Sequence, residues 1–254
     1  MTAPPAGDVR QGTMRPLTHA LLQKLLLGLS RVLFRLQVVG AEHVPREGGI
    51  IVVANHVHNL DPPLLAIACP RPLHFMAKKE AMDVPVLGRI LRWGGAFPVN
   101  RGHADRNAIR RAVATVQQGV ALGMFPEGTR SRTVRIERVL PGVGLVALMG
   151  RVPIVPAAIT GTERLPFNGA KQLRRGDALP DPGHRGVRIV FGEPFTLPET
   201  IDGRRTTAET ATDYMMRRVA ELLPEAYRGI YATTPRPDPA PAPRRQGTGP
   251  MPEG

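Results

Sequence analysis

The chain has 254 residues, which is enough for one well-buried α/β domain and short for two domains with separate cores. Lys and Arg total 34 against 21 Asp and Glu, so we expect an anionic partner or substrate, whether nucleic acid, acidic phospholipid or phosphorylated metabolite. Three Tyr and one Trp offer little for base stacking, which argues against nucleic acid, although a solvated Arg-rich surface without any partner also fits the charge.

The N-terminal region has two parts. Residues 1–16 are rich in Pro, Gly and polar groups, and we predict a flexible N-terminus. Residues 17–36 have the spacing of an amphipathic helix, with one apolar stripe formed by Leu22, Leu25, Leu26, Leu29, Leu33 and Leu36. Lys24, Arg31 and Arg35 lie on the other face and argue against a transmembrane span, and Lys24 also argues against a secretory signal. Periodicity leaves two interpretations open, a helix that docks on an anionic membrane or one that covers the edge of the core.

Two β-branched runs, residues 36–40 and 49–54, predict strands. The second strand leads into the polar segment 55–61, which places His56 at the carboxyl end of a strand, where open α/β sheets bind ligands. Asp61 is a candidate to orient the imidazole of His56, which then acts as a general base. Asp61 also precedes a proline and fits a helix N-cap, so both roles stay open.

His58 and Cys69 receive no chemical role. No Cys or Glu accompanies His56 and His58, so we expect a loop residue at position 58 and no metal site. Cys69 lies in an apolar stretch and is expected to be a small buried side chain. As the only cysteine it cannot form an internal disulfide, which fits a reducing cytosolic setting.

Positive charge is concentrated in the middle of the chain. Between residues 71 and 111 there are nine Lys or Arg and three Asp or Glu, which suits a phosphate-bearing ligand. This region predicts a short strand over residues 73–77, a helix over 85–91, a strand over 93–101 and a solvated outer helix over 104–118.

The second half of the chain contains another polar segment. A strand over residues 120–125 leads into Glu127, which is flanked by Pro and Gly. These neighbours favour a turn, so the backbone there serves to position Glu127 more than to pair in a helix or sheet. A basic loop follows over residues 161–186, and either rims a channel or is simply solvated. Last come an alternating strand at the edge of the sheet, a final helix and a disordered Pro-rich tail, predicted over residues 187–192, 206–223 and 232–254.

These motifs resemble the glycerolipid (lysophospholipid) acyltransferase family. Asn55-His56, four residues and Asp61 resemble its first block, and residues 125–130 (Phe-Pro-Glu-Gly-Thr-Arg) resemble its third. Residues 96–101 and 152–158 are similar to the second and fourth blocks, so the likeness covers residues 36–162. The resemblance implies an α/β fold of the glycerol-3-phosphate acyltransferase type, with a central, mostly parallel sheet flanked by helices, here preceded by the amphipathic helix.

The resemblance also implies roles for individual residues. His56 is the general base, Asp61 orients it, and Arg101 pairs with the phosphate of the acceptor. The remaining acceptor-binding residues are Glu127, Gly128, Thr129 and Arg130. The chain departs from the family pattern at His58, where the family often has Ser, and it lacks the lysine of a Phe-Lys-x-Gly block after Arg130.

The expected reaction moves an acyl group from a thioester to a lysophospholipid hydroxyl, foremost from acyl-CoA or acyl carrier protein to 1-acyl-glycerol-3-phosphate, giving phosphatidic acid. A hydroxyl needs a base to become a good nucleophile, whereas a thioester needs no metal, so we expect neither a metal nor a cofactor beyond the co-substrate.

The expected partners are the acyl donor, the lysophospholipid and an anionic membrane surface, with no nucleic acid. We expect a peripheral protein at the cytoplasmic face of the cell membrane, with a docking helix over residues 17–36 and an acyltransferase domain over 37–231. The alternatives are another acceptor (glycerol-3-phosphate, an amino-acid lipid or a glycolipid) and a non-enzymatic basic protein that binds membranes or nucleic acid.

Overall fold

The computed structural model describes residues 16–78, 82–83, 85, 96–99, 106–166 and 179–232. Four predictions fall largely or wholly outside these residues: the flexible N-terminus, the helix over residues 85–91, the position of Arg101 and the Pro-rich tail.

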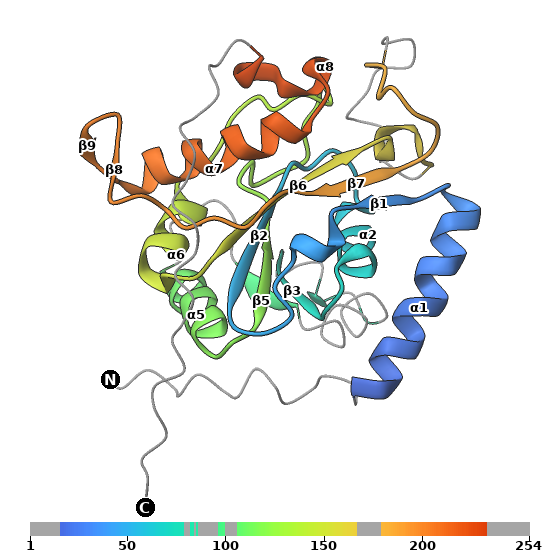
Figure 1. Cartoon of the computed structure of the whole chain (residues 1–254), viewed down its shortest axis with the longest axis horizontal. Coiled ribbons are helices and arrows are strands. Elements are labelled where there is room, and N and C mark those ends of the chain that lie inside the picture. Colours follow the sequence, from blue (N-terminus) through green and yellow to red (C-terminus); the bar gives the residue numbers. More distant parts are fainter. Residues whose placement is uncertain are drawn as a thin grey trace, which may run out of the picture.

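The centre of the molecule is a sheet with the strand order β1-β7-β6-β2-β5-β3-β4 (Figure 1). All neighbouring pairs are parallel except β6 and β7, which confirms the prediction of a mostly parallel sheet. The strands are β1 (Gln37–Val39), β2 (Ile50–Ala54), β3 (Leu73–Lys78), β4 (Phe97–Val99), β5 (Ala121–Met124), β6 (Ile154–Thr160) and β7 (Arg188–Phe191). Two short strands, β8 (Thr200–Ile201) and β9 (Arg204–Arg205), pair separately.

Strand β2 is buried on both faces because helices cover the sheet on both sides (Figure 1). Successive side chains of a strand point to opposite faces, so Ile51 and Val53 enter one apolar cluster and Ile50 and Val52 enter the other. The first cluster contains residues of α5 (Arg106–Gln117), α6 (Gly142–Gly150) and α7 (Ala208–Leu222), and the second contains residues of α1 (Pro16–Leu33) and α2 (Asp61–Ala68).

The predicted final helix is α7, which begins after the N-cap Thr207. The Thr207 side chain accepts the N–H of Thr210, and the Thr210 hydroxyl in return accepts the N–H of Thr207, so this capping box fixes the start of the helix. The shorter helices are η1 (Ala41–His43), η2 (Thr162–Arg164), α8 (Glu225–Arg228) and η3 (Gly229–Tyr231).

The predicted position of the last strand was wrong. β7 lies inside the sheet, between β1 and β6, and β1 occupies the edge. The alternating sequence of residues 187–192 suggested a strand with one solvated face, but Val190 is half-buried and packs on the first cluster. The pairing of β1 with β7, from Gln37 opposite Arg188 to Val39 opposite Val190, joins distant parts of the chain and has no local signature.

Helix α1 ends at Leu33, three residues before the predicted end. The N–H groups of Phe34 and Leu36 both donate to the carbonyl of Ser30, and Arg35 between them has a left-handed φ of 49°, which stops the helix. No helix among the described residues is long and apolar enough to cross a membrane.

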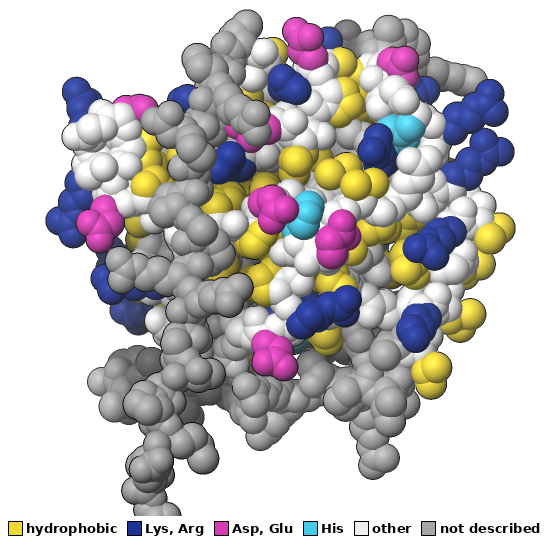
Figure 2. All heavy atoms as spheres, in the orientation of Figure 1, with side chains coloured by type: hydrophobic (Ala, Val, Ile, Leu, Met, Phe, Trp, Pro, Cys, Tyr) yellow, Lys and Arg dark blue, Asp and Glu magenta, His cyan; other side chains and the backbone are white. Residues whose placement is uncertain are grey.

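The side chains of α1 are divided between two apolar faces. Leu22, Leu26 and Leu27 are half-buried on the protein side, where Gln23 also donates from Nε2 to the carbonyls of Ile67 and Cys69. The other face exposes Leu21, Leu25, Leu29, Val32 and Leu33, which lie along one side of the molecule among Lys and Arg side chains (Figure 2). The helix therefore covers the edge of the core and also presents an apolar surface.

Candidate active site

The sheet brings the two polar segments together. β2 and β5 are parallel neighbours, with Val53 opposite Met124, and both polar segments begin where these strands end. His56 and Glu127, which are 71 residues apart in the sequence, therefore meet at the carboxyl edge of the sheet.

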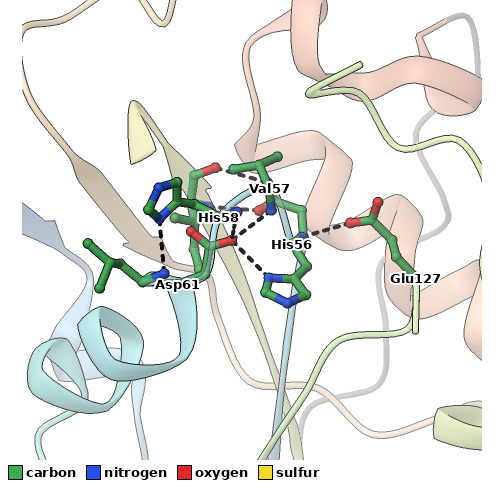
Figure 3. Close-up of polar contacts among 8 residues, drawn as sticks. His56, Val57, His58, Asp61 and Glu127 are labelled. Carbon is green, nitrogen blue, oxygen red and sulfur yellow. Dashed lines mark hydrogen bonds and ion pairs between the residues drawn. The ribbon is translucent and has the colours of Figure 1, made fainter. Parts of the chain in front are cut away.

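Asp61 holds His56 by a direct hydrogen bond (Figure 3). Nδ1 of His56 lies 2.9 Å from Oδ2 of Asp61, and the same oxygen accepts the N–H groups of Val57 and His58, each at 2.6 Å. A carboxylate can only accept here, so Nδ1 carries the proton and the lone pair lies on Nε2. Within the described chain no residue hydrogen-bonds to Nε2 of His56, which is the arrangement a general base requires.

The helix-cap interpretation of Asp61 was wrong. Asp61 is the first residue of α2, the N-cap position is Leu60, and no side chain caps the helix. The two residues after Asp61 are prolines, which have no N–H to be capped. The carboxylate is thus left to bind the loop before the helix and the imidazole of His56.

The main chain of His56 is held from both sides by the segment that follows β5. Its N–H donates to Oε1 of Glu127 at 2.7 Å, and its carbonyl accepts the N–H of Ser131 at 2.8 Å. Only 3% of Glu127 is exposed, and this burial raises the pKa of its carboxyl group to about 8. The His56 N–H lowers this pKa, while the charges of Asp61 and Glu137 raise it further.

Two further residues shape the site without having been predicted to do so. The ring of Phe125 stacks on the His56 imidazole, with 4.4 Å between centroids and 28° between planes. The side-chain amide of Asn55 exchanges two hydrogen bonds with the backbone of Ile159, at 2.9 and 2.8 Å, and so extends the β2–β6 pairing by one residue. The sequence does contain a signal for each residue: Phe125 is an aromatic residue directly before Pro-Glu-Gly, and Asn55 is an amide at the end of an apolar strand.

The predicted acceptor-binding residues lie on a tight turn beside His56. Gly128 has a φ of 68°, a conformation that favours glycine, and its N–H donates to the carbonyl of Phe125. Thr129 is exposed, whereas Arg130 is half-buried. Burial lowers the pKa of the Arg130 guanidinium and the nearby Asp61 charge opposes this shift, which places a cation close to the His56–Asp61 pair. Arg101 lies outside the described residues.

Comparison with known proteins gives consistent matches. A family model described as Acyltransferase matches residues 35–160, which include both polar segments. The chain is 30% identical over 161 residues to the 1-acyl-sn-glycerol-3-phosphate acyltransferase of Bacillus subtilis (strain 168), covering 63% of this chain and 73% of that protein. It is 33% identical over 213 residues to the protein of the same name from Saccharomyces cerevisiae, covering 79% of this chain and 63% of the yeast protein.

Solved structures agree with the sequence matches. The crystal structure of the 1-acyl-sn-glycerophosphate (LPA) acyltransferase PlsC from Thermotoga maritima aligns with a TM-score of 0.58 at 25% identity. The alignment covers 83% of each chain, so the similarity extends well beyond the site.

Proposed function

Because the chain belongs to the Acyltransferase family, as its motifs predicted, we propose that it acylates lysophosphatidic acid to phosphatidic acid. It is an O-acyltransferase of phospholipid biosynthesis, and its donor is an acyl thioester of coenzyme A or of acyl carrier protein. The observation that carries this proposal is the His56–Asp61 pair, which engages Nδ1 and leaves Nε2 of the imidazole to act as a base at the carboxyl edge of the sheet.

The reaction follows from this geometry. Nε2 of His56 removes the proton from the acceptor hydroxyl while the hydroxyl oxygen bonds to the thioester carbonyl carbon. The tetrahedral oxyanion collapses, the carbon–sulfur bond breaks, and His56 returns the proton to the departing thiolate. Asp61 stabilises the transient imidazolium and keeps Nδ1 protonated. The hydroxyl attacks the donor directly, so no acyl-enzyme intermediate forms.

The acceptor phosphate binds to the cationic side of the site. Arg130 supplies one guanidinium next to the His56–Asp61 pair, Thr129 supplies a hydroxyl on the same turn, and Gly128 allows the turn through its positive φ. Arg101 is proposed as the second phosphate contact on the strength of the sequence motif. Oε1 of Glu127 is already bonded to the main chain of His56, so Glu127 supports the site and reaches the acceptor only through its remaining oxygen.

Helix α1 docks the protein on an anionic membrane surface at the cytoplasmic face of the cell membrane. The support is the exposed apolar face, where 67% of Leu25 and 78% of Val32 are accessible, flanked by exposed Lys24 and Arg31. In this proposal residues 17–36 form the docking segment and residues 37–231 form the acyltransferase domain.

The first experiment measures transfer of a labelled acyl group from acyl-CoA and from acyl carrier protein to several acceptors. We expect lysophosphatidic acid to be the best acceptor. Preference for glycerol-3-phosphate, an amino-acid lipid or a glycolipid would keep the chemistry and overturn the acceptor. Absence of transfer to every acceptor would overturn the proposed function.

The second experiment replaces the base. We expect His56→Ala to lower turnover by about 100- to 10,000-fold, because proton removal in the transition state is lost. The circular dichroism spectrum and thermal midpoint should stay near those of the parent protein. His43→Ala is the matched control, since His43 is bonded to Phe191 and Glu193 away from the site, and it should retain full turnover. Near-normal turnover of His56→Ala would contradict the mechanism.

A further inference from the structure

His58 is a buried titratable side chain that the proposed chemistry does not use. It is fully buried in the loop between β2 and α2, although it lies only two residues from the base. Figure 3 shows the imidazoles of His56 and His58 on either side of the Asp61 carboxylate, pointing in different directions. The two imidazoles lie on one loop but have different surroundings, so we expect His56 and His58 to have different roles.

The hydrogen bonds of His58 close the turn that presents Asp61. Its ring nitrogen Nδ1 lies 3.0 Å from the N–H of Leu60, its own N–H donates to Oδ2 of Asp61, and its carbonyl accepts the N–H of Asp61 at 3.1 Å. An imidazole nitrogen that accepts an N–H carries no proton, so neutral His58 has its proton on Nε2. This is the opposite tautomer to that of His56.

The surroundings of His58 favour the neutral ring. Burial lowers its pKa from the ordinary value of 6.5, and the positive charge of Arg130 lowers it further. The charge of Asp61 and the backbone carbonyls of Leu165 and Pro166 act in the opposite direction. These groups come from α2, from the turn after β5 and from the loop after η2, which are the elements that face the ring.

We propose that His58 is a positioning residue that works only as the neutral Nε2–H tautomer, and that its protonation releases the loop holding Asp61 against His56. A proton on Nδ1 would face the N–H of Leu60, so two donors would oppose each other where one hydrogen bond existed. The turn over residues 58–61 then opens, and the His56–Asp61 bond loses its fixed geometry. Protonation of His58 therefore lowers activity in acid, although this ring never contacts substrate.

The tautomer is testable without any assay of activity. Long-range proton–nitrogen NMR of the imidazoles, with His58→Asn used to assign the signal, reports which ring nitrogen is protonated. We expect His58 to be the Nε2–H tautomer at neutral pH and to titrate below its ordinary pKa. A charged ring or an Nδ1–H tautomer at neutral pH would overturn the proposal.

The functional arm rests on the proposed acyl transfer and compares three variants. In His58→Asn the side-chain oxygen takes the place of Nδ1 as acceptor and cannot be protonated, so most of kcat should remain at neutral pH. In His58→Leu the acceptor is lost, and kcat should fall about 10- to 100-fold with little change in KM. His184→Asn is the control for replacing a histidine outside this loop. Burial also lowers the pKa of His184, but its side chain bonds to Thr160 and not to the loop that holds Asp61.

The pH profile separates positioning from a merely structural role. In acid, log kcat/KM of the parent protein should fall more steeply than that of His58→Asn, because only the parent protein carries a protonatable group at position 58. Equal slopes, or equal activity of the Asn and Leu variants, would overturn the proposal. If His58→Leu does not fold, the slopes of the parent and His58→Asn decide. If the parent transfers no acyl group at all, the proposed function fails, and the NMR measurement still decides the role of His58.

Discussion

Glu127 makes stability depend on pH in a direction opposite to that of an ordinary paired carboxylate. Its folded-state pKa of about 8 lies above the ordinary 4.5, so the folded protein holds a proton that the unfolded chain releases. Stability is therefore greatest below about pH 4.5 as far as this group is concerned, and it falls as pH rises toward 8. The slope reaches up to about 1.4 kcal/mol per pH unit for one proton.

Glu127→Gln should remove this slope and keep an oxygen for the N–H of His56. In denaturant unfolding across this pH window, the variant should gain stability over the parent protein as pH increases. Glu137→Gln is the control, because Glu137 is exposed and acts on Glu127 only through its charge. Parallel curves for Glu127→Gln and the parent protein would show that the carboxyl group is not buried in its neutral form.

The sequence predicted the pairing of His56 with Asp61 because both residues lie on one short loop, where spacing alone limits their geometry. It did not predict the hydrogen bond from His56 N–H to Glu127, nor the stacking of Phe125, because these depend on the register between β2 and β5. The choice between orienting and capping at Asp61 depends on where the helix begins: the N–H of Leu64 donates to the carbonyl of Leu60, so Asp61 already lies inside the helix and does not cap it.

At the level of elements, α1 divides its apolar side chains between protein and surroundings, so the two faces should respond differently to substitution. Leu25→Ser with Val32→Ser should weaken binding to anionic vesicles by about 100-fold or more, because each large apolar side chain buried in the interface contributes about 1.5–3 kcal/mol. The thermal midpoint should stay unchanged, since both side chains are exposed in the folded protein. Vesicle co-sedimentation and thermal unfolding measure the two effects.

Leu27→Ala provides the matched comparison on the opposite face. Leu27 is half-buried against the core cluster, so this variant should lower the thermal midpoint and leave vesicle binding largely intact. Unchanged vesicle binding by the double serine variant would show that α1 is not the docking element.

The predictability of the elements depended on whether their signals were local. Strands β2 and β5 were predicted because apolar runs between turn residues suffice, and α7 because its periodicity is strong. The antiparallel position of β7 inside the sheet was missed because β1 pairs with it across about 150 residues, and loop closure over such a distance leaves no pattern in either strand.

For the whole molecule, the formal net charge of +13 predicts a membrane affinity that depends on salt. Binding to vesicles containing phosphatidylglycerol should weaken steadily with added NaCl, while the weaker binding to phosphatidylcholine vesicles should change little. Co-sedimentation over a salt series measures both. Duplex DNA serves as the competitor, and displacement of the protein from the vesicles by DNA would favour a general polyanion-binding protein.

The contacts that build the site join residues at very different separations in the sequence. The hydrogen bond between His56 and Asp61 joins residues five positions apart, whereas Glu127 and Ile159 reach the same loop across 71 and 104 residues. Local contacts close first, because bringing distant segments together costs more chain entropy. We therefore expect the distant backbone support of this loop to form last on refolding, so that recovery of activity lags behind recovery of secondary structure.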